Sequence, residues 1–406
     1  MTIGVGGSLA KIELEKLTNM VTDVKPITLL EYKQRIKKAQ QLMKQTNIAA
    51  MYLNAGTNLY YFTGAKWYTS ERLVGAIIPQ QGKIQYLAPY FEMDTLRQHM
   101  IVEGEVQGWQ EHQSPYKLFI NTLTALEITE GNIAIDESTA FFITNGIQEI
   151  NKIYHLVDAK PITAGCRWQK SDTEIALLQQ AKNMTLAVQK SVARILKIGI
   201  STEDVTDFIN QAHKKVGATG SFFCIVLFGQ DSAYPHGVKK PKLLEKNDMV
   251  LIDTGCQLEG YHSDITRSYV FGEANERQRD MWQIEKMAQQ AAFDAAEIGK
   301  NCADIDNAAR HCLANNGLGP DYQTPGCPHR TGHGIGLDIH EWPYLVRSDK
   351  TRLIKGMCFS NEPMLVLPEE FGIRLEDHFY ITEKGAKWFT EPSFSIDDPF
   401  GYQKPQ

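Results

Sequence analysis

Two aspartates occur in neighbouring strand-like segments, where their carboxylates could hold a cation. Asp253 ends the apolar run of residues 249–252, and Asp264 directly precedes a second β-branched segment. A four-residue turn over residues 257–260 would place Asp253 directly opposite Asp264 in an antiparallel ladder. Facing residues on one side of such a ladder have Cβ atoms about 4.5–5.5 Å apart. Two ionised carboxylates that close in an apolar core repel each other, so we expect a positive group between them.

Two glutamates repeat this arrangement further along the chain. Glu362 and Glu376 each follow an apolar stretch, and residues 367–372 between them are typical of a loop that joins antiparallel strands. One strand carboxylate alone is usually a solvated edge residue. Four acids at the centres of strand-like segments are harder to explain in that way, and together they indicate a cation site.

A glycine-rich segment, residues 328–341, adds three histidines: His329, His333 and His340. His333 lies among three glycines, where the backbone can approach another group closely. A lone histidine such as His311 is expected to be structural. One imidazole and four carboxylates form a hard ligand set that suits two divalent ions, with Mn²⁺ preferred and Co²⁺, Fe²⁺ or Zn²⁺ as alternatives. Two ions about 3.5–4 Å apart can share a water, so we predict a dinuclear hydrolase site.

Composition argues against several other classes of protein. The 406 residues include 42 Lys+Arg and 48 Asp+Glu, a net charge of −6, with no basic block for binding nucleic acid. No apolar run reaches the roughly 18 residues that span a bilayer, so no membrane partner is expected. The seven cysteines form no C-x-x-C pair, which disfavours a disulfide framework or a structural zinc site. The first ten residues lack a basic n-region, which favours a cytoplasmic location, with a removed export signal as the alternative.

The pattern of elements predicts two domains. An amphipathic helix over residues 28–46, a buried strand over 48–53 and a hairpin within 72–87 predict a smaller α/β domain, residues 26–164. The second domain, residues 165–406, carries the acids and histidines. It has two similar halves with predicted helices at 172–198, 202–215, 277–297 and 302–316. Its extended segments are 222–228, 249–255, 261–271, 357–366 and 373–382. We therefore predict an α+β fold with mainly antiparallel strands.

These motifs closely resemble those of the pita-bread metallopeptidases, a family that includes methionine aminopeptidase, aminopeptidase P, prolidase and the metal-free creatinase. Ile-Asp-Thr-Gly, Ser-Asp-Ile-Thr-Arg, Thr-Gly-His-Gly-Ile-Gly, Asn-Glu-Pro and Arg-Leu-Glu-Asp match the family in order and spacing. The N-terminal segments Asn-Leu-Tyr-Tyr-Phe-Thr-Gly and Ser-Glu-Arg-Leu resemble a creatinase-type N-terminal domain. The resemblance implies that such a domain precedes a pita-bread catalytic domain. It also implies that the metal ligands are Asp253, Asp264, His333, Glu362 and Glu376.

Further roles are implied only by the resemblance. His236 and His340 match residues that stabilise the tetrahedral intermediate and contact the substrate. Glu362 matches the general acid/base. His329 and Arg374 match substrate-binding positions, although Arg374 could instead hold a ligand carboxylate. Of two further residues beside the aspartates, His262 and Arg267, we expect support of the ligands rather than contact with the ions.

The implied reaction is hydrolysis of the peptide bond before proline, in Xaa-Pro dipeptides or at peptide N-termini, by a metal-bridging hydroxide. The implied partners are a proline-containing di- or oligopeptide and a second copy of the chain in a homodimer. A non-peptidase enzyme on the same scaffold, either a metal-dependent lyase or a creatinase-like hydrolase, is the alternative. A catalytically inactive binding module would have replaced ligands, and none of the five is replaced. Sequence alone does not separate dipeptidase from aminopeptidase.

Overall fold

The computed structural model describes residues 2–404, which form two compact units. One unit is Ile27–Arg167, and the other combines the segment before Ile27 with the segment from Trp168 onward. Thr2 ties the early segment to the second unit, because its backbone N–H donates to the carbonyl of Gly272 at 3.0 Å. The sequence prediction had left residues 1–25 outside both domains. Within residues 2–404, no helix is long and apolar enough to cross a membrane.

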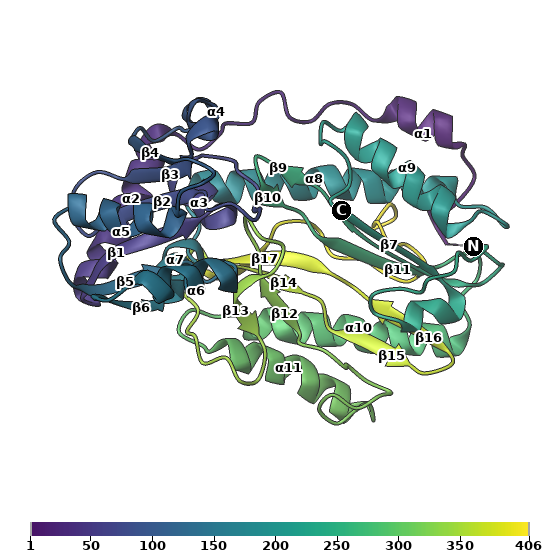
Figure 1. The fold of residues 1–406 in the computed structure, drawn as a ribbon. Helices are drawn as coiled ribbons and strands as arrows, with labels where there is room; N and C mark the ends of the chain where they lie inside the picture. Colours follow the sequence, from purple (N-terminus) through teal and green to yellow (C-terminus); the bar gives the residue numbers. More distant parts are fainter. Residues whose placement is uncertain (1, 405–406) are drawn as a thin grey trace. The chain divides into compact units, whose positions relative to one another are not determined.

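The Ile27–Arg167 unit is an α/β domain built on one mixed six-stranded sheet (Figure 1). The strand order is β4-β3-β2-β1-β5-β6, and β2 is antiparallel to both of its neighbours while the other pairs are parallel. The predicted hairpin is confirmed as β2 and β3. The strands are β1 Ile48–Asn54, β2 Gly75–Pro79, β3 Gln85–Pro89, β4 Glu105–Trp109, β5 Gly131–Ile135 and β6 Tyr154–Asp158. The helices are α2 Leu29–Gln45, α3 Thr57–Thr63, η1 Tyr90–Glu92, α4 Met93–His99, α5 Pro115–Ala125, α6 Phe141–Ile150 and α7 Lys160–Arg167.

The second unit contains the two predicted helix pairs. The first pair begins with a capping box between Ser171 and Glu174, and the second begins with one between Asn275 and Gln278. In each box the two residues satisfy one another's backbone N–H, which fixes where the helix starts. The helices are α1 Ala10–Lys16, α8 Asp172–Ile195, α9 Thr202–Lys215, α10 Glu276–Ala295 and α11 Cys302–Asn315, with the short 3₁₀ helix η2 at Gly229–Ala233.

The strands of this unit are antiparallel throughout, as predicted. One sheet has the order β11-β8-β7, a second has the order β13-β12-β14-β17-β18, and two hairpins, β9-β10 and β15-β16, complete the set. The first sheet and its hairpin are β7 Phe223–Phe228, β8 Met249–Gly255, β9 Gln257–Leu258, β10 Tyr261–His262 and β11 Ile265–Val270. The remaining strands are β12 Gly332–Gly334, β13 Glu341–Leu345, β14 Cys358–Asn361, β15 Met364–Leu367, β16 Phe371–Arg374, β17 Asp377–Thr382 and β18 Gly385–Trp388.

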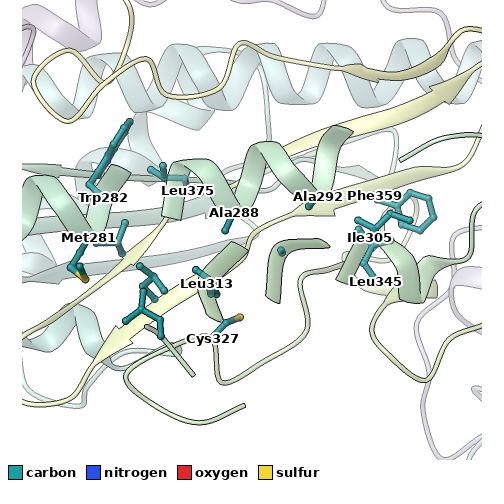
Figure 2. Close-up of a cluster of buried hydrophobic side chains, with 14 of the residues drawn as sticks. Met281, Trp282, Ala288, Ala292, Ile305, Leu313, Cys327, Leu345, Phe359 and Leu375 are labelled. Carbon is teal, nitrogen blue, oxygen red and sulfur yellow. The ribbon is translucent and has the colours of Figure 1, made fainter. Parts of the chain in front are cut away.

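A hydrophobic core lies between the second helix pair and these strands (Figure 2). Ala288 and Ala292 of α10 are fully buried, and their small side chains let the neighbouring elements approach closely. Ile305 of α11 and Phe359 of β14 belong to the same cluster. Burial of each large apolar side chain stabilises the fold by about 1.5–3 kcal/mol, so this core holds β14 and β17 firmly in place.

The predicted register of the aspartate hairpin is wrong. β8 and β11 pair with Asp253 facing Thr266, which is two residues away from the predicted partner, Asp264. The hairpin closes through only two residues, Glu259 and Gly260, at φ values of 50° and 84°. Positive φ at both loop residues is the geometry of a two-residue type I′ hairpin, whose twist matches the strands. The prediction placed the turn over residues 257–260, whereas Leu258 pairs with Tyr261 and the turn is centred on Glu259 and Gly260.

A buried histidine in α9 predicts a loss of stability in acid. His213 is fully buried between Thr185 and Ser221, and burial lowers its pKa to about 4. As pH falls from about 6.5 to about 4, the unfolded chain takes up a proton at this site that the folded chain does not. The free energy of unfolding of the metal-free protein therefore falls over that window, by up to about 3 kcal/mol. Urea unfolding at several pH values should give a shallower slope for His213→Gln, and parallel curves would contradict the assignment.

Candidate metal centre

Glu362 and Glu376 lie opposite each other at a break between two ladders. β14 pairs with β17 on one side of the two glutamates, and β15 pairs with β16 on the other. Both ladders keep the same register, in which Glu362 faces Glu376. Pro363 interrupts the ladder between them because it has no backbone N–H to donate. The predicted antiparallel pairing of this region is confirmed.

Asp253 joins the glutamates through the strand between them. Thr266 of β11 pairs with Asp253 on one side and forms an isolated bridge with Glu376 on the other. The Thr266 hydroxyl donates to Glu376 Oε2 at 2.7 Å and accepts from Arg374 Nε at 3.1 Å. Arg374 also donates through Nη2 to Asp253 Oδ2 at 2.5 Å. Of the two partners considered for Arg374, a substrate carboxylate or a ligand carboxylate, the structure contains the second.

Asp264 and His333 complete the cluster. His333 Nε2 lies 3.0 Å from Glu362 Oε1 and 3.9 Å from Asp264 Oδ2. The opposite ring nitrogen, Nδ1, donates to the carbonyl of Gly334 at 3.0 Å, which orients the ring with Nε2 toward the acids. Gly332 lets the backbone before His333 lie close to β14, because a Cβ at residue 332 would be 2.1 Å from the carbonyl oxygen of Ser360. The glycines therefore permit the close approach that the sequence predicted.

The chemistry of this set fits divalent cations. Asp253 Oδ1, Asp264 Oδ1 and Glu376 Oε1 are buried and have no hydrogen-bond partner within residues 2–404. Buried polar atoms in folded proteins are normally paired. Burial, then the charges of Glu376 and Asp253, raises the pKa of Asp264 well above its usual range. Burial, then the charges of Glu362 and Asp253, does the same to the pKa of Glu376. A cation would satisfy the unpaired oxygens and relieve this repulsion.

Arg267 supports the cluster from behind. Its guanidinium is fully buried and donates to the carbonyl of Glu376 at 3.0 Å and to Asp377 Oδ1 at 2.8 Å. Asp377 also accepts from the hydroxyl of Thr390 at 3.1 Å. These contacts hold the backbone that carries Glu376. The sequence predicted a supporting role for Arg267, and the structure places it there.

Similarity to known proteins now identifies the family. A model of metallopeptidase family M24 matches residues 176–383, which is just over half of the chain. The chain belongs to metallopeptidase family M24. A model of the creatinase/prolidase N-terminal domain matches residues 35–169, so the M24 catalytic domain follows a creatinase-type domain, as the resemblance implied.

Similar proteins cover most of the chain. The Xaa-Pro dipeptidase of Pyrococcus furiosus is 30% identical over 361 residues, which are 88% of this chain and 98% of the relative. Two solved structures are similar throughout. A prolidase from Thermococcus sibiricus has a TM-score of 0.81 at 29% identity, covering 89% of this chain and 97% of its own. The dipeptidase PepE from Mycobacterium ulcerans has a TM-score of 0.82 at 29% identity, covering 90% and 97%. The protein is therefore a hydrolase of the M24 type, and the family implies divalent metal ions.

The resemblance also implied roles for three further histidines. His340 is exposed, and its ring contacts that of His333 with centroids 4.2 Å apart. His236 is exposed in the turn after η2. His329 is half-buried, and its Nδ1 donates to the carbonyl of Arg330 at 2.6 Å. Of the three, His340 thus lies directly beside a proposed ligand.

Two residues beside the proposed metal ligands were not predicted from the sequence. Lys182 of α8 is fully buried and donates to the carbonyl of His262 at 3.2 Å, and burial lowers its pKa to about 8. His378 of β17 is fully buried with Nε2 3.9 Å from Glu376 Oε1. Burial, then the charge of Lys182, lowers the pKa of His378 well below its usual range. Strand alternation could have indicated His378, because it lies two residues after Glu376 and so on the same face.

Proposed function

We propose that this M24 enzyme hydrolyses the Xaa-Pro peptide bond, in dipeptides or at peptide N-termini, with two divalent ions. Mn²⁺ is the preferred ion, with Co²⁺, Fe²⁺ or Zn²⁺ as alternatives. The observation that carries the proposal is the convergence of four carboxylates and one imidazole with three buried, unpaired carboxylate oxygens. The names of the relatives support the substrate, since the similar proteins include an Xaa-Pro dipeptidase and a prolidase.

In this proposal the ions are held by the following five side chains: Asp253, Asp264, His333, Glu362 and Glu376. Bound together, the ions would lower the pKa of a shared water toward neutrality and so supply the nucleophile. The remaining chemistry belongs to the chain. Glu362 accepts from the Ser360 hydroxyl at 3.1 Å and lies 3.0 Å from His333 Nε2. Burial alone would raise the pKa of Glu362, but the hydrogen bond and charge of His333 lower it below its usual range. Glu362 is therefore ionised, as a metal ligand must be. Its role as general acid/base in this proposal comes from the family resemblance.

In this proposal His236 and His340 supply hydrogen-bond donors to the substrate carbonyl. An imidazole N–H that faces the carbonyl oxygen stabilises the negative charge that develops there. His329 completes the proposed substrate side, whereas Arg374 holds the carboxylate of Asp253. The proposal includes a homodimer and a cytoplasmic location. The unpaired carboxylate oxygens argue against a creatinase-like site without metal.

His340→Ala should reduce turnover much more than it reduces metal binding. The imidazole lies against His333 but is exposed, so its loss should leave the buried carboxylates in place. Removing one donor to a developing oxyanion typically lowers kcat by about 10²–10³-fold. Steady-state kinetics on an Xaa-Pro dipeptide, with bound metal measured on the same sample, checks this. Unchanged kinetics would remove His340 from the catalytic site.

The substrate assignment is tested with three peptides and the Mn²⁺-loaded protein. An Xaa-Pro dipeptide, an Xaa-Pro tripeptide and the matching Xaa-Ala dipeptide share the first residue and differ in one feature each. Release of the first residue from the proline dipeptide but not from the Xaa-Ala dipeptide supports the proposal. Cleavage of the tripeptide separates aminopeptidase from dipeptidase. Failure to cleave either proline peptide, with metal bound, would overturn the substrate assignment.

A further inference from the structure

His378 lies on the same face of its strand as the proposed ligand Glu376. Successive strand residues point to opposite faces, so Glu376 and His378 share a face while Asp377 between them points to the other, toward Arg267. Across the ladder, His378 pairs with Ser360, whose hydroxyl hydrogen-bonds to Glu362. The imidazole thus lies beside Glu376 and Asp264, two of the proposed ligands.

The ring of His378 has no protein partner that would explain its burial. Neither of its nitrogens has a hydrogen-bond partner in the described part of the chain, although the residue is fully buried. His213, a fully buried histidine of α9, contrasts with it, because both of its ring nitrogens contact hydroxyls at 2.9–3.0 Å. An unpaired polar group costs about 1–3 kcal/mol on burial. A group outside the chain would remove that cost.

The distances place one ion within reach of His378. His378 Nε2 lies 3.9 Å from Glu376 Oε1, and Asp264, Glu376 and His378 offer ligand atoms that all lie within 4.8 Å of one another. Ligand atoms bound to one ion at about 2.0–2.2 Å are separated by at most about 4.4 Å. The observed 3.9 Å therefore suits coordination of one ion by both side chains.

We propose that His378 is a sixth ligand of the metal centre and binds one ion together with Asp264 and Glu376. This inference rests on the proposed function, since it assumes that the five-residue set holds metal. The ion bound by Asp264, Glu376 and His378 would then have an imidazole ligand as well as carboxylates. Imidazole suits Co²⁺, Fe²⁺ and Zn²⁺ better than Mn²⁺, so the position shared by Asp264, Glu376 and His378 should prefer the former ions.

The test compares metal binding by His378→Ala with that of the unmodified full-length protein and of His213→Ala. Both variants lose a buried imidazole from the same unit, but His213 lies outside the metal cluster. Calorimetric titration of metal-free protein with Co²⁺, and separately with Mn²⁺, gives the dissociation constants and the number of ions. We expect His378→Ala to weaken Co²⁺ binding at one position by at least about tenfold, and Mn²⁺ binding by less. His213→Ala should lose stability while keeping both constants.

His378→Cys provides a gain of signal that does not depend on stability or activity. A thiolate that binds Co²⁺ produces an intense sulfur-to-cobalt charge-transfer band in the near ultraviolet. The Co²⁺-loaded unmodified protein, with its seven native cysteines, is the baseline. A new band in His378→Cys supports the proposal. No band, or unchanged Co²⁺ affinity in folded His378→Ala, overturns it while leaving the five-ligand function intact. Absence of metal binding by the unmodified protein would instead overturn both.

Discussion

Asp264→Asn should abolish hydrolysis and prevent one of the two ions from binding. Asp264 is 4% exposed and belongs to two of the candidate metal groups, one with Glu376 and one with His333. Asparagine keeps the shape of the side chain but offers only a neutral oxygen. Loss of an outer supporting residue typically weakens metal binding by about 10–100-fold, and loss of a ligand should cost more.

The stability of this variant should change in opposite directions with and without metal. In the metal-free protein, the charge of Asp264 is repelled by Glu376 and Asp253, so Asp264→Asn should be at least as stable as the unmodified chain. With an ion at about 1,000 times its Kd, the unmodified protein gains about 4 kcal/mol, most of which the variant should lose. Thermal unfolding with and without Mn²⁺ measures both effects. Asp136→Asn, a buried aspartate of the Ile27–Arg167 unit, is the control and should respond to Mn²⁺ normally. An active Asp264→Asn with two bound ions would contradict the ligand assignment.

Arg267→Met should lower the free energy of unfolding by about 3–5 kcal/mol. The variant leaves the fully buried carboxylate of Asp377 without its ion-pair partner, and the carbonyl of Glu376 loses a donor. Breaking a buried pair is costly because one charge stays behind without compensation. Because β17 follows Glu376 directly, metal affinity should fall with stability. Urea unfolding and metal titration of the same sample measure the two losses.

A surface arginine provides the matched control for this variant. Arg277 pairs with Glu370 at 3.1 Å, and both side chains are nearly half exposed. Exposed pairs contribute about 0–1 kcal/mol, so Arg277→Met should unfold close to the unmodified protein. The double variant Arg267→Met/Asp377→Asn should recover part of the lost stability, because no buried charge remains unpaired. A loss below about 1 kcal/mol for Arg267→Met would show that this pair does not hold the strand.

The sequence predicted the architecture because it depends on local patterns, and the family resemblance supplied the proposed ligand set. Apolar segments around Asp253 and Glu362, and capping signals such as Ser171, are readable along the chain without knowledge of distant contacts. The family match and the antiparallel strands confirm the fold. The hairpin register was missed because it depends on two backbone angles at Glu259 and Gly260, and a glutamate at positive φ leaves no trace in composition.

Features that depend on three-dimensional neighbours were beyond sequence patterns. Thr2 joins the catalytic unit through contacts with residues about 270 positions away. Lys182 looks like one polar residue in an amphipathic helix, yet it is fully buried. Arg374 could not be assigned to substrate or ligand until its 2.5 Å contact with Asp253 was seen. In each case the deciding quantity was a distance between segments far apart in the sequence.

The most direct measurement titrates metal-free protein with Mn²⁺ while following bound metal and hydrolysis of an Xaa-Pro dipeptide on the same sample. The account predicts two ions per chain, with hydrolysis absent from the metal-free protein and rising as the ions bind. The three unpaired oxygens, Asp253 Oδ1, Asp264 Oδ1 and Glu376 Oε1, are the physical reason for this expectation. Full hydrolysis without metal, or saturation of the protein with Mn²⁺ and no hydrolysis, would contradict the account.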